Sequence, residues 1–128
     1  MESTGFNCPK VLHWFEWGKK RLNLYDIVAH TTNTVDLEIS FKIPSFSRSI
    51  LLPSGHIYLM GGEEPEYFSR KEVYMYSLLT NDKKLHSKAN MPHKKFDFTI
   101  CFLNGYIYSL CGKDGGSEVV ASCEKYNV

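Results

Sequence analysis

Short runs of aliphatic and aromatic residues, separated by turn-forming residues, dominate the pattern of hydrophobic and polar positions. A Pro-Ser-Gly turn joins two of these runs, residues 49–52 and 56–60. Asn104-Gly105, the strongest short hairpin signal, joins two more, residues 99–103 and 106–110. All four runs are apolar on both faces, which is typical of strands buried between stacked sheets. The pattern therefore predicts two antiparallel hairpins.

More strands are predicted beyond the first hairpin. A polar loop follows it, and a third strand is expected at residues 72–76. A turn at residues 80–82 then leads to a weaker strand at residues 85–91. Each period of the chain thus holds four short antiparallel strands.

The hairpins belong to an internal repeat. The segment from Gly55 to Gly62 is echoed by the segment from Gly105 to Gly112, fifty positions further along. A tyrosine follows each closing glycine after fourteen residues, at Tyr76 and Tyr126, and Tyr25 marks an earlier copy. Several sequence features that recur with the same period indicate a repeat architecture.

The repeat resembles the kelch repeat, in which a hairpin ending in Gly-Gly precedes a tyrosine and then Met-Pro, at a period of about 50 residues. Here Met91-Pro92 takes the last position, and Ile43-Pro44 matches it in the preceding copy. Gly61-Gly62 is intact only in the middle copy, because Cys111 replaces the first glycine in the last copy. Leu85 stands where kelch repeats carry a tryptophan. The resemblance implies blades of a β-propeller, a ring of about 4 to 8 four-stranded sheets.

The expected fold is all-β, an incomplete kelch-type β-propeller of four-stranded antiparallel blades. The first copy begins on a second strand, and the last copy stops in or just after its third strand. Three blades, two of them partial, cannot close a ring, which needs about four. The expected parts are an N-terminal extension at residues 1–10, a partial blade at 11–44, a complete blade at 45–92 and a partial blade at 93–128.

Two explanations of the incomplete ring stay open. The chain is either a piece of a longer propeller or one half of a ring made by two chains. In both cases the open blade edges expose unpaired strands, so the chain alone is expected to self-associate.

Composition and charge narrow the function classes. Fifteen basic and fourteen acidic residues leave a formal net charge of +1, which provides no field to attract nucleic acid or an anionic membrane. No apolar run is long enough to cross a membrane, and the first ten residues do not form a secretory signal, so we expect a cytoplasmic protein. The irregular spacing of the four cysteines indicates reduced core thiols rather than a disulfide framework, at Cys8, Cys101, Cys111 and Cys123.

No motif predicts catalysis or metal binding. The five histidines are scattered, and no two lie at metal-ligand spacing on one predicted element. The sequence also lacks a nucleophile elbow, a zinc-protease motif and a phosphate-binding loop. We therefore expect no enzyme activity, no cofactor and no metal.

The predicted loops supply the candidate binding residues. The resemblance implies that loops between second and third strands and loops between blades share one face, which kelch propellers use to bind partners. Arg48, seven residues before Gly55, resembles the arginine at the start of a kelch inner strand. For the lysine pair at 94 and 95, a solvated loop is the alternative. The candidate residues are Phe46, Arg48, Tyr67, Phe68, Lys94 and Lys95.

These features together predict a non-catalytic protein-protein interaction module that acts as a scaffold or substrate adaptor. The resemblance implies protein partners, engaged through an acidic segment, in a ubiquitin-ligase or cytoskeletal role. The alternative is a fragment of a kelch-type propeller enzyme, an oxidase or a sugar-processing enzyme. Its active site would be completed by residues outside this chain.

Overall fold

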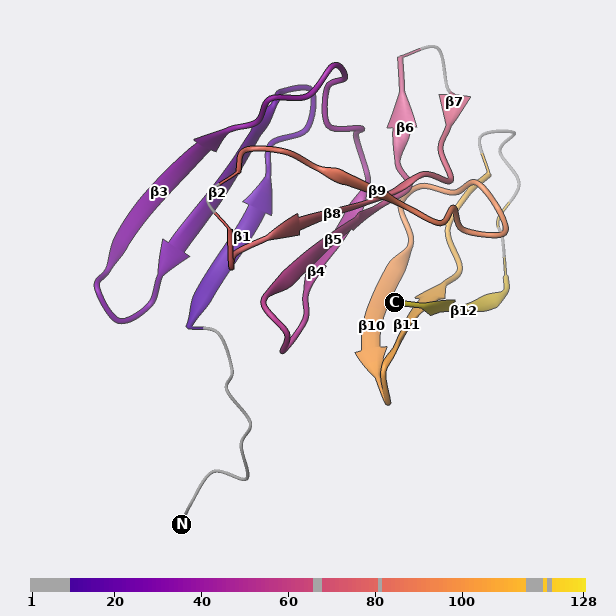
Figure 1. The fold of residues 1–128 in the computed structure, drawn as a ribbon. Helices are drawn as coiled ribbons and strands as arrows, with labels where there is room; N and C mark the ends of the chain where they lie inside the picture. Colours follow the sequence, from indigo (N-terminus) through magenta and orange to yellow (C-terminus); the bar gives the residue numbers. More distant parts are fainter. Residues whose placement is uncertain (1–9, 66–67, 81, 115–118, 120) are drawn as a thin grey trace.

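The protein forms short strands and tight turns. The structure, a computed structural model, describes residues 10–65, 68–80, 82–114, 119 and 121–128. The strands of these residues make three antiparallel sheets and one small hairpin (Figure 1). Within the described ranges there is no helix that could span a bilayer. The all-β prediction is confirmed, and none of the sheets closes on itself.

The first sheet contains three strands in chain order. They are β1 (Val11–Phe15), β2 (Arg21–Asp26) and β3 (Thr31–Asp36). β1 pairs only with β2, so its other edge has no strand partner among the described residues.

The second sheet contains four strands in the order β4-β5-β8-β9. They are β4 (Arg48–Leu51), β5 (His56–Met60), β8 (Val73–Ser77) and β9 (His86–Lys88). β9 is shorter than the predicted strand at residues 85–91. The predicted loop before β8 instead contains a small hairpin of β6 (Glu63–Glu64) and β7 (Phe68–Ser69).

The third sheet contains β10 (Thr99–Leu103), β11 (Tyr106–Leu110) and β12 (Cys123–Asn127). Asn104 and Gly105 connect β10 to β11 with φ angles of 51° and 84°. Positive φ at both central residues matches the right-handed twist of the flanking strands, so the hairpin predicted at Asn-Gly is confirmed.

Two apolar layers hold the three sheets together. β5 contributes to both layers because its successive side chains point to opposite faces. Its Ile57 and Leu59 belong to the layer shared with the first sheet, and its Tyr58 and Met60 belong to the layer shared with the third sheet. The first layer also contains Phe15, Leu22, Leu37, Ile43 and Tyr76, and the second also contains Leu52, Val73, Met91, Phe98, Ile107 and Tyr126.

The backbone repeats with the sequence. Gly61 and Gly62 have φ angles of 62° and 104°, and fifty positions later Cys111 and Gly112 have 57° and 104°. Glycine is required at the first of these positions in the second sheet, because a Cβ on Gly61 would lie 2.5 Å from the carbonyl oxygen of Lys95. Cys111 adopts the same left-handed backbone conformation, which is energetically unfavourable for a residue that has a side chain.

The cysteines in and near the third sheet are exposed, which contradicts the prediction that they lie in the core. The thiols of Cys101, Cys111 and Cys123 are free and exposed, so the interpretation of core thiols is wrong for them; Cys8 lies outside the described residues. Cys101 and its neighbour Leu103 lie on the face of β10 that no other described sheet covers. For the same reason β10 is not buried on both faces, unlike β5.

Candidate interaction surface

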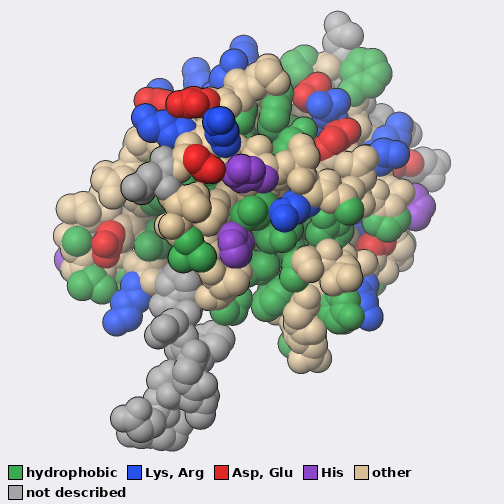
Figure 2. Space-filling model, in the orientation of Figure 1, with side chains coloured by type: hydrophobic (Ala, Val, Ile, Leu, Met, Phe, Trp, Pro, Cys, Tyr) green, Lys and Arg blue, Asp and Glu red, His purple; other side chains and the backbone are tan. Residues whose placement is uncertain are grey.

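The segments predicted to carry binding residues lie near one end of the sheets. The β1–β2 turn and the β6–β7 hairpin stand at the upper edge in Figure 1. Figure 2 shows charged side chains of both signs gathered along that edge, whereas hydrophobic side chains reach the surface lower on the same face. Loops held on a rigid sheet scaffold are a frequent place for binding residues.

Three aromatic rings from three different connections form a row. The Trp17 ring lies 5.1 Å from the Phe46 ring, and the Phe46 ring lies 6.2 Å from the Phe96 ring, measured between centroids. Trp17 is 46% exposed and Phe46 is 39% exposed. Phe46 has a φ of 57°, and its carbonyl accepts a hydrogen bond from the Asp97 amide (3.0 Å). The backbone thus fixes the candidate Phe46 in an accessible position between two other rings.

Arg48 makes contacts within its own chain. Its Nε donates a hydrogen bond to the Phe98 carbonyl (2.6 Å), and one Nη donates to the Ser47 carbonyl (3.2 Å). The other Nη forms an ion pair with Asp97 (3.1 Å). Arg48 therefore ties the start of β4 to the segment before β10. Its side chain remains 32% exposed, so part of the guanidinium is still accessible.

Lys95 is fully buried, which corrects the solvated-loop interpretation for this residue. Its Nζ donates a hydrogen bond to Ser109 Oγ (2.9 Å), forms an ion pair with Glu124 and lies 5.7 Å from the centroid of the Phe98 ring. The carboxylate that neutralises Lys95 comes from β12, and no local pattern around residue 95 indicates it. Lys95 consequently has no surface to offer a partner.

The acid of this cluster also binds a histidine. Glu124 Oε2 lies 2.8 Å from His93 Nδ1. Burial raises the pKa of the Glu124 carboxyl, but hydrogen bonds from Lys95 and His93 outweigh that effect and hold its pKa below the ordinary value. Although a serine beside a lysine resembles a nucleophile and its base, Ser109 is only 1% exposed and the lysine is held in an ion pair with Glu124. The cluster is structural.

A groove of about 480 Å³ lies between the β6–β7 hairpin and the segment before β10. Phe68 in its wall is 63% exposed. Arg70 is paired with two glutamates, at 3.3 Å and 3.2 Å. Lys71 and Lys94 are exposed and form no ion pair with any residue that the structure describes. The groove therefore unites the candidates Phe68 and Lys94 with Lys71, which the sequence analysis missed; Tyr67 lies outside the described residues.

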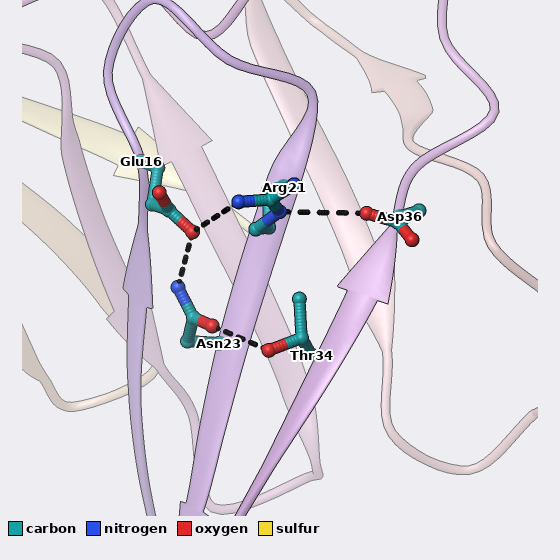
Figure 3. A network of polar contacts seen from close by, with 5 residues as sticks. All are labelled: Glu16, Arg21, Asn23, Thr34 and Asp36. Carbon is teal, nitrogen blue, oxygen red and sulfur yellow. Dashed lines mark hydrogen bonds and ion pairs between the residues drawn. The ribbon is translucent and has the colours of Figure 1, made fainter.

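The outward face of the first sheet carries a polar network that the sequence analysis also missed (Figure 3). Asn23 donates a hydrogen bond to Glu16 (2.8 Å) and accepts one from Thr34 (2.9 Å). Arg21 lies 3.6 Å from Glu16 and 3.4 Å from Asp36. The network joins β2 and β3 to Glu16, the residue that follows β1, and it satisfies the buried amide of Asn23, so its role is structural.

No metal site among the described residues and no similar known protein indicates a function for this chain. In the described part of the chain, no three His, Cys, Asp or Glu side chains are grouped so that they could hold a metal ion. A scan against models of protein families finds no match, and a search of curated proteins finds no similar sequence. The geometry of the surface therefore carries the functional argument.

Proposed function

We propose that this chain is a non-catalytic protein-interaction module, part of a kelch-type β-propeller that acts as a scaffold or substrate adaptor. Three antiparallel sheets joined through two apolar layers support a blade-like arrangement. The recurrence of the positive φ angles after fifty residues supports the repeat. Among the described residues the first and third sheets have three strands each, which fits the expected partial blades.

The groove beside the β6–β7 hairpin carries the proposal. Its lining includes an exposed aromatic ring, Phe68, and two exposed lysines, Lys71 and Lys94. An aromatic side chain can anchor an apolar residue of a partner, and unpaired lysines attract carboxylates and steer their approach. The partner is therefore a protein segment that combines acidic residues with an aliphatic residue. In this proposal Lys95 belongs to the scaffold, Arg48 lies outside the groove that takes the acidic segment, and the aromatic row around Phe46 adds accessible apolar surface.

Binding of labelled peptides by the intact chain tests this proposal. The probe is a peptide with alternating Glu and Leu residues, and a peptide with Lys in place of Glu is the charge control. Fluorescence anisotropy should detect binding of the acidic peptide only. Its affinity should fall as salt rises, because these exposed charges are screened.

Variants locate the binding. Lys71→Glu combined with Lys94→Glu should lower the affinity for the acidic peptide at least tenfold, and Phe68→Ala should lower it severalfold. Lys88→Glu on β9 is the matched control, because it makes the same charge change on an exposed strand outside the groove. This variant should bind the acidic peptide with an affinity close to that of the unchanged chain. Equal affinities for all of these variants would remove the groove from the proposal.

A further inference from the structure

A second concave site lies beside the aromatic row, between the end of β1 and the start of β4. This hollow has a volume of about 270 Å³. Phe15 and Leu59 contribute buried apolar surface to it, at 8% and 2% exposure. Trp14 and Trp17 also line it and are 45% and 46% exposed. The complete lining consists of His13, Trp14, Phe15, Trp17, Ser47, Arg48, Ser49 and Leu59.

The polar groups of the hollow include unused hydrogen-bonding capacity. Ser47 is 4% exposed, and its Oγ has no hydrogen-bond partner among the described residues. A guanidinium has five N–H groups, of which Arg48 uses three on residues that the structure describes, so two remain unused among these residues. Each indole adds one N–H donor. His13 and Ser49 satisfy each other at 2.9 Å, and burial lowers the pKa of His13, which favours its neutral form.

We propose that this hollow binds a proline-rich segment in the polyproline II conformation. Such a segment has free carbonyl acceptors and, at each proline, no N–H donor, so it complements the donors of Arg48 and the indoles. Proline rings pack well on aromatic surfaces, and aromatic-lined grooves are the usual receptors of polyproline II ligands. The inference extends the proposed function by adding a second partner chemistry. Its site is separate from the groove beside the β6–β7 hairpin that contains Lys71 and Lys94, here called the lysine groove.

The local charge favours a neutral ligand over an acidic one. Asp97 forms an ion pair with Arg48, so the guanidinium next to the hollow is already neutralised. A carboxylate from a partner would have to compete with Asp97, whereas a carbonyl can accept from the remaining N–H groups without displacing it. The hollow and the lysine groove therefore select different ligands.

The aromatic row gives the ligand a path beyond the hollow. Trp17 lines the hollow, and its ring contacts that of Phe46, which in turn lies beside that of Phe96. Polyproline II advances about 3.1 Å per residue. A segment of roughly six residues could therefore fill the hollow and continue over the Phe46 ring.

Intrinsic fluorescence provides a direct test, because both tryptophans of the chain line the hollow. The intact chain is titrated with capped hexaproline, with a capped Gly-Ser hexapeptide as the length control. A saturable change in tryptophan emission is expected with hexaproline only. Trp17→Ala and Ser47→Val should each weaken binding at least fivefold. Phe68→Ala changes the lysine groove and not the hollow, so this variant should bind hexaproline with the same affinity as the unchanged chain.

The outcomes separate this inference from the proposed function. An unchanged emission spectrum up to millimolar hexaproline overturns the inference, as does an equal response to the Gly-Ser peptide. Saturable binding of maltohexaose without hexaproline binding would make the hollow a carbohydrate site and also overturns it. If hexaproline fails while the acidic peptide still binds, the proposed function stands and only the inference falls. Trp17→Phe keeps an aromatic ring and should retain binding. Retained binding by this variant would show that Trp17→Ala loses affinity through the missing ring contact and not through misfolding.

Discussion

Replacement of the buried Lys95 by methionine should lower the free energy of unfolding by about 3 kcal/mol. Methionine preserves most of the side-chain volume, so the main loss is electrostatic. Removing one partner of a buried ion pair typically costs about 3 to 5 kcal/mol, because the remaining charge is buried without compensation. The lower end applies here because Glu124 is still 11% exposed and keeps its contact with His93. Loss of the hydrogen bond to Ser109 acts in the same direction.

Urea denaturation followed by circular dichroism measures this effect, and a double-mutant cycle assigns it. The double variant Lys95→Met with Glu124→Leu removes both charges and should recover most of the loss, to within about 1 kcal/mol of the unchanged chain. The neighbouring Lys94→Met is the matched control. Since that lysine is exposed, its replacement should change the stability by less than about 0.5 kcal/mol.

The pH dependence gives an independent readout of the same ion pair. The pKa of Glu124 is lowered from 4.5 in the folded chain, so its stabilising contribution is complete above pH 4.5 and is lost as the pH falls through the lowered value. The Lys95→Met variant should lose part of this acid-dependent contribution. A cost below 1 kcal/mol for Lys95→Met, with no coupling in the cycle, would refute the view that this pair is buried and structural.

Four variants at other positions test further parts of the structure. Gly61→Ala should cost more than about 2 kcal/mol in urea denaturation because of the clash with the Lys95 carbonyl, whereas Cys111→Gly should add up to about 1 kcal/mol by relieving a left-handed backbone. Because burial lowers the pKa of His13 from 6.5, stability should decline as the pH falls below 6.5, and urea midpoints of His13→Gln should not show this decline. Arg48→Lys should cost about 1 to 2 kcal/mol by the same assay, and no measurable loss would contradict its role as a tie between sheets.

Much of the local structure could be predicted from the sequence, because turn chemistry and hydrophobic alternation act over a few residues. β5, β10 and β11 have the predicted bounds, and Asn104-Gly105 forms the predicted hairpin connection. The fifty-residue repeat reappears in the backbone angles, and it persists at Cys111 although a side chain there makes positive φ unfavourable. The β6–β7 hairpin was missed because its two-residue strands are too short to show a period.

The candidate surface was predictable only in part. Phe46, Phe68 and Lys94 are accessible, as expected for residues of loops. Lys71 escaped notice because it joins the groove only when the chain after β7 folds against the segment before β10. Trp14 was overlooked because its position on a strand gave no sign that a hollow lies beside it.

The sequence by itself determined the two hairpins of longer strands, the tight turns that close them and the repeat of the pattern. Only the tertiary structure decided the environment of each polar or reactive side chain. Lys95 is buried because Glu124, on a strand that follows it in the chain, neutralises its charge. The exposure of Cys101 has the opposite cause, since no described sheet covers its side of β10. Burial and pairing depend on which distant segments meet, and a local pattern carries no record of those contacts.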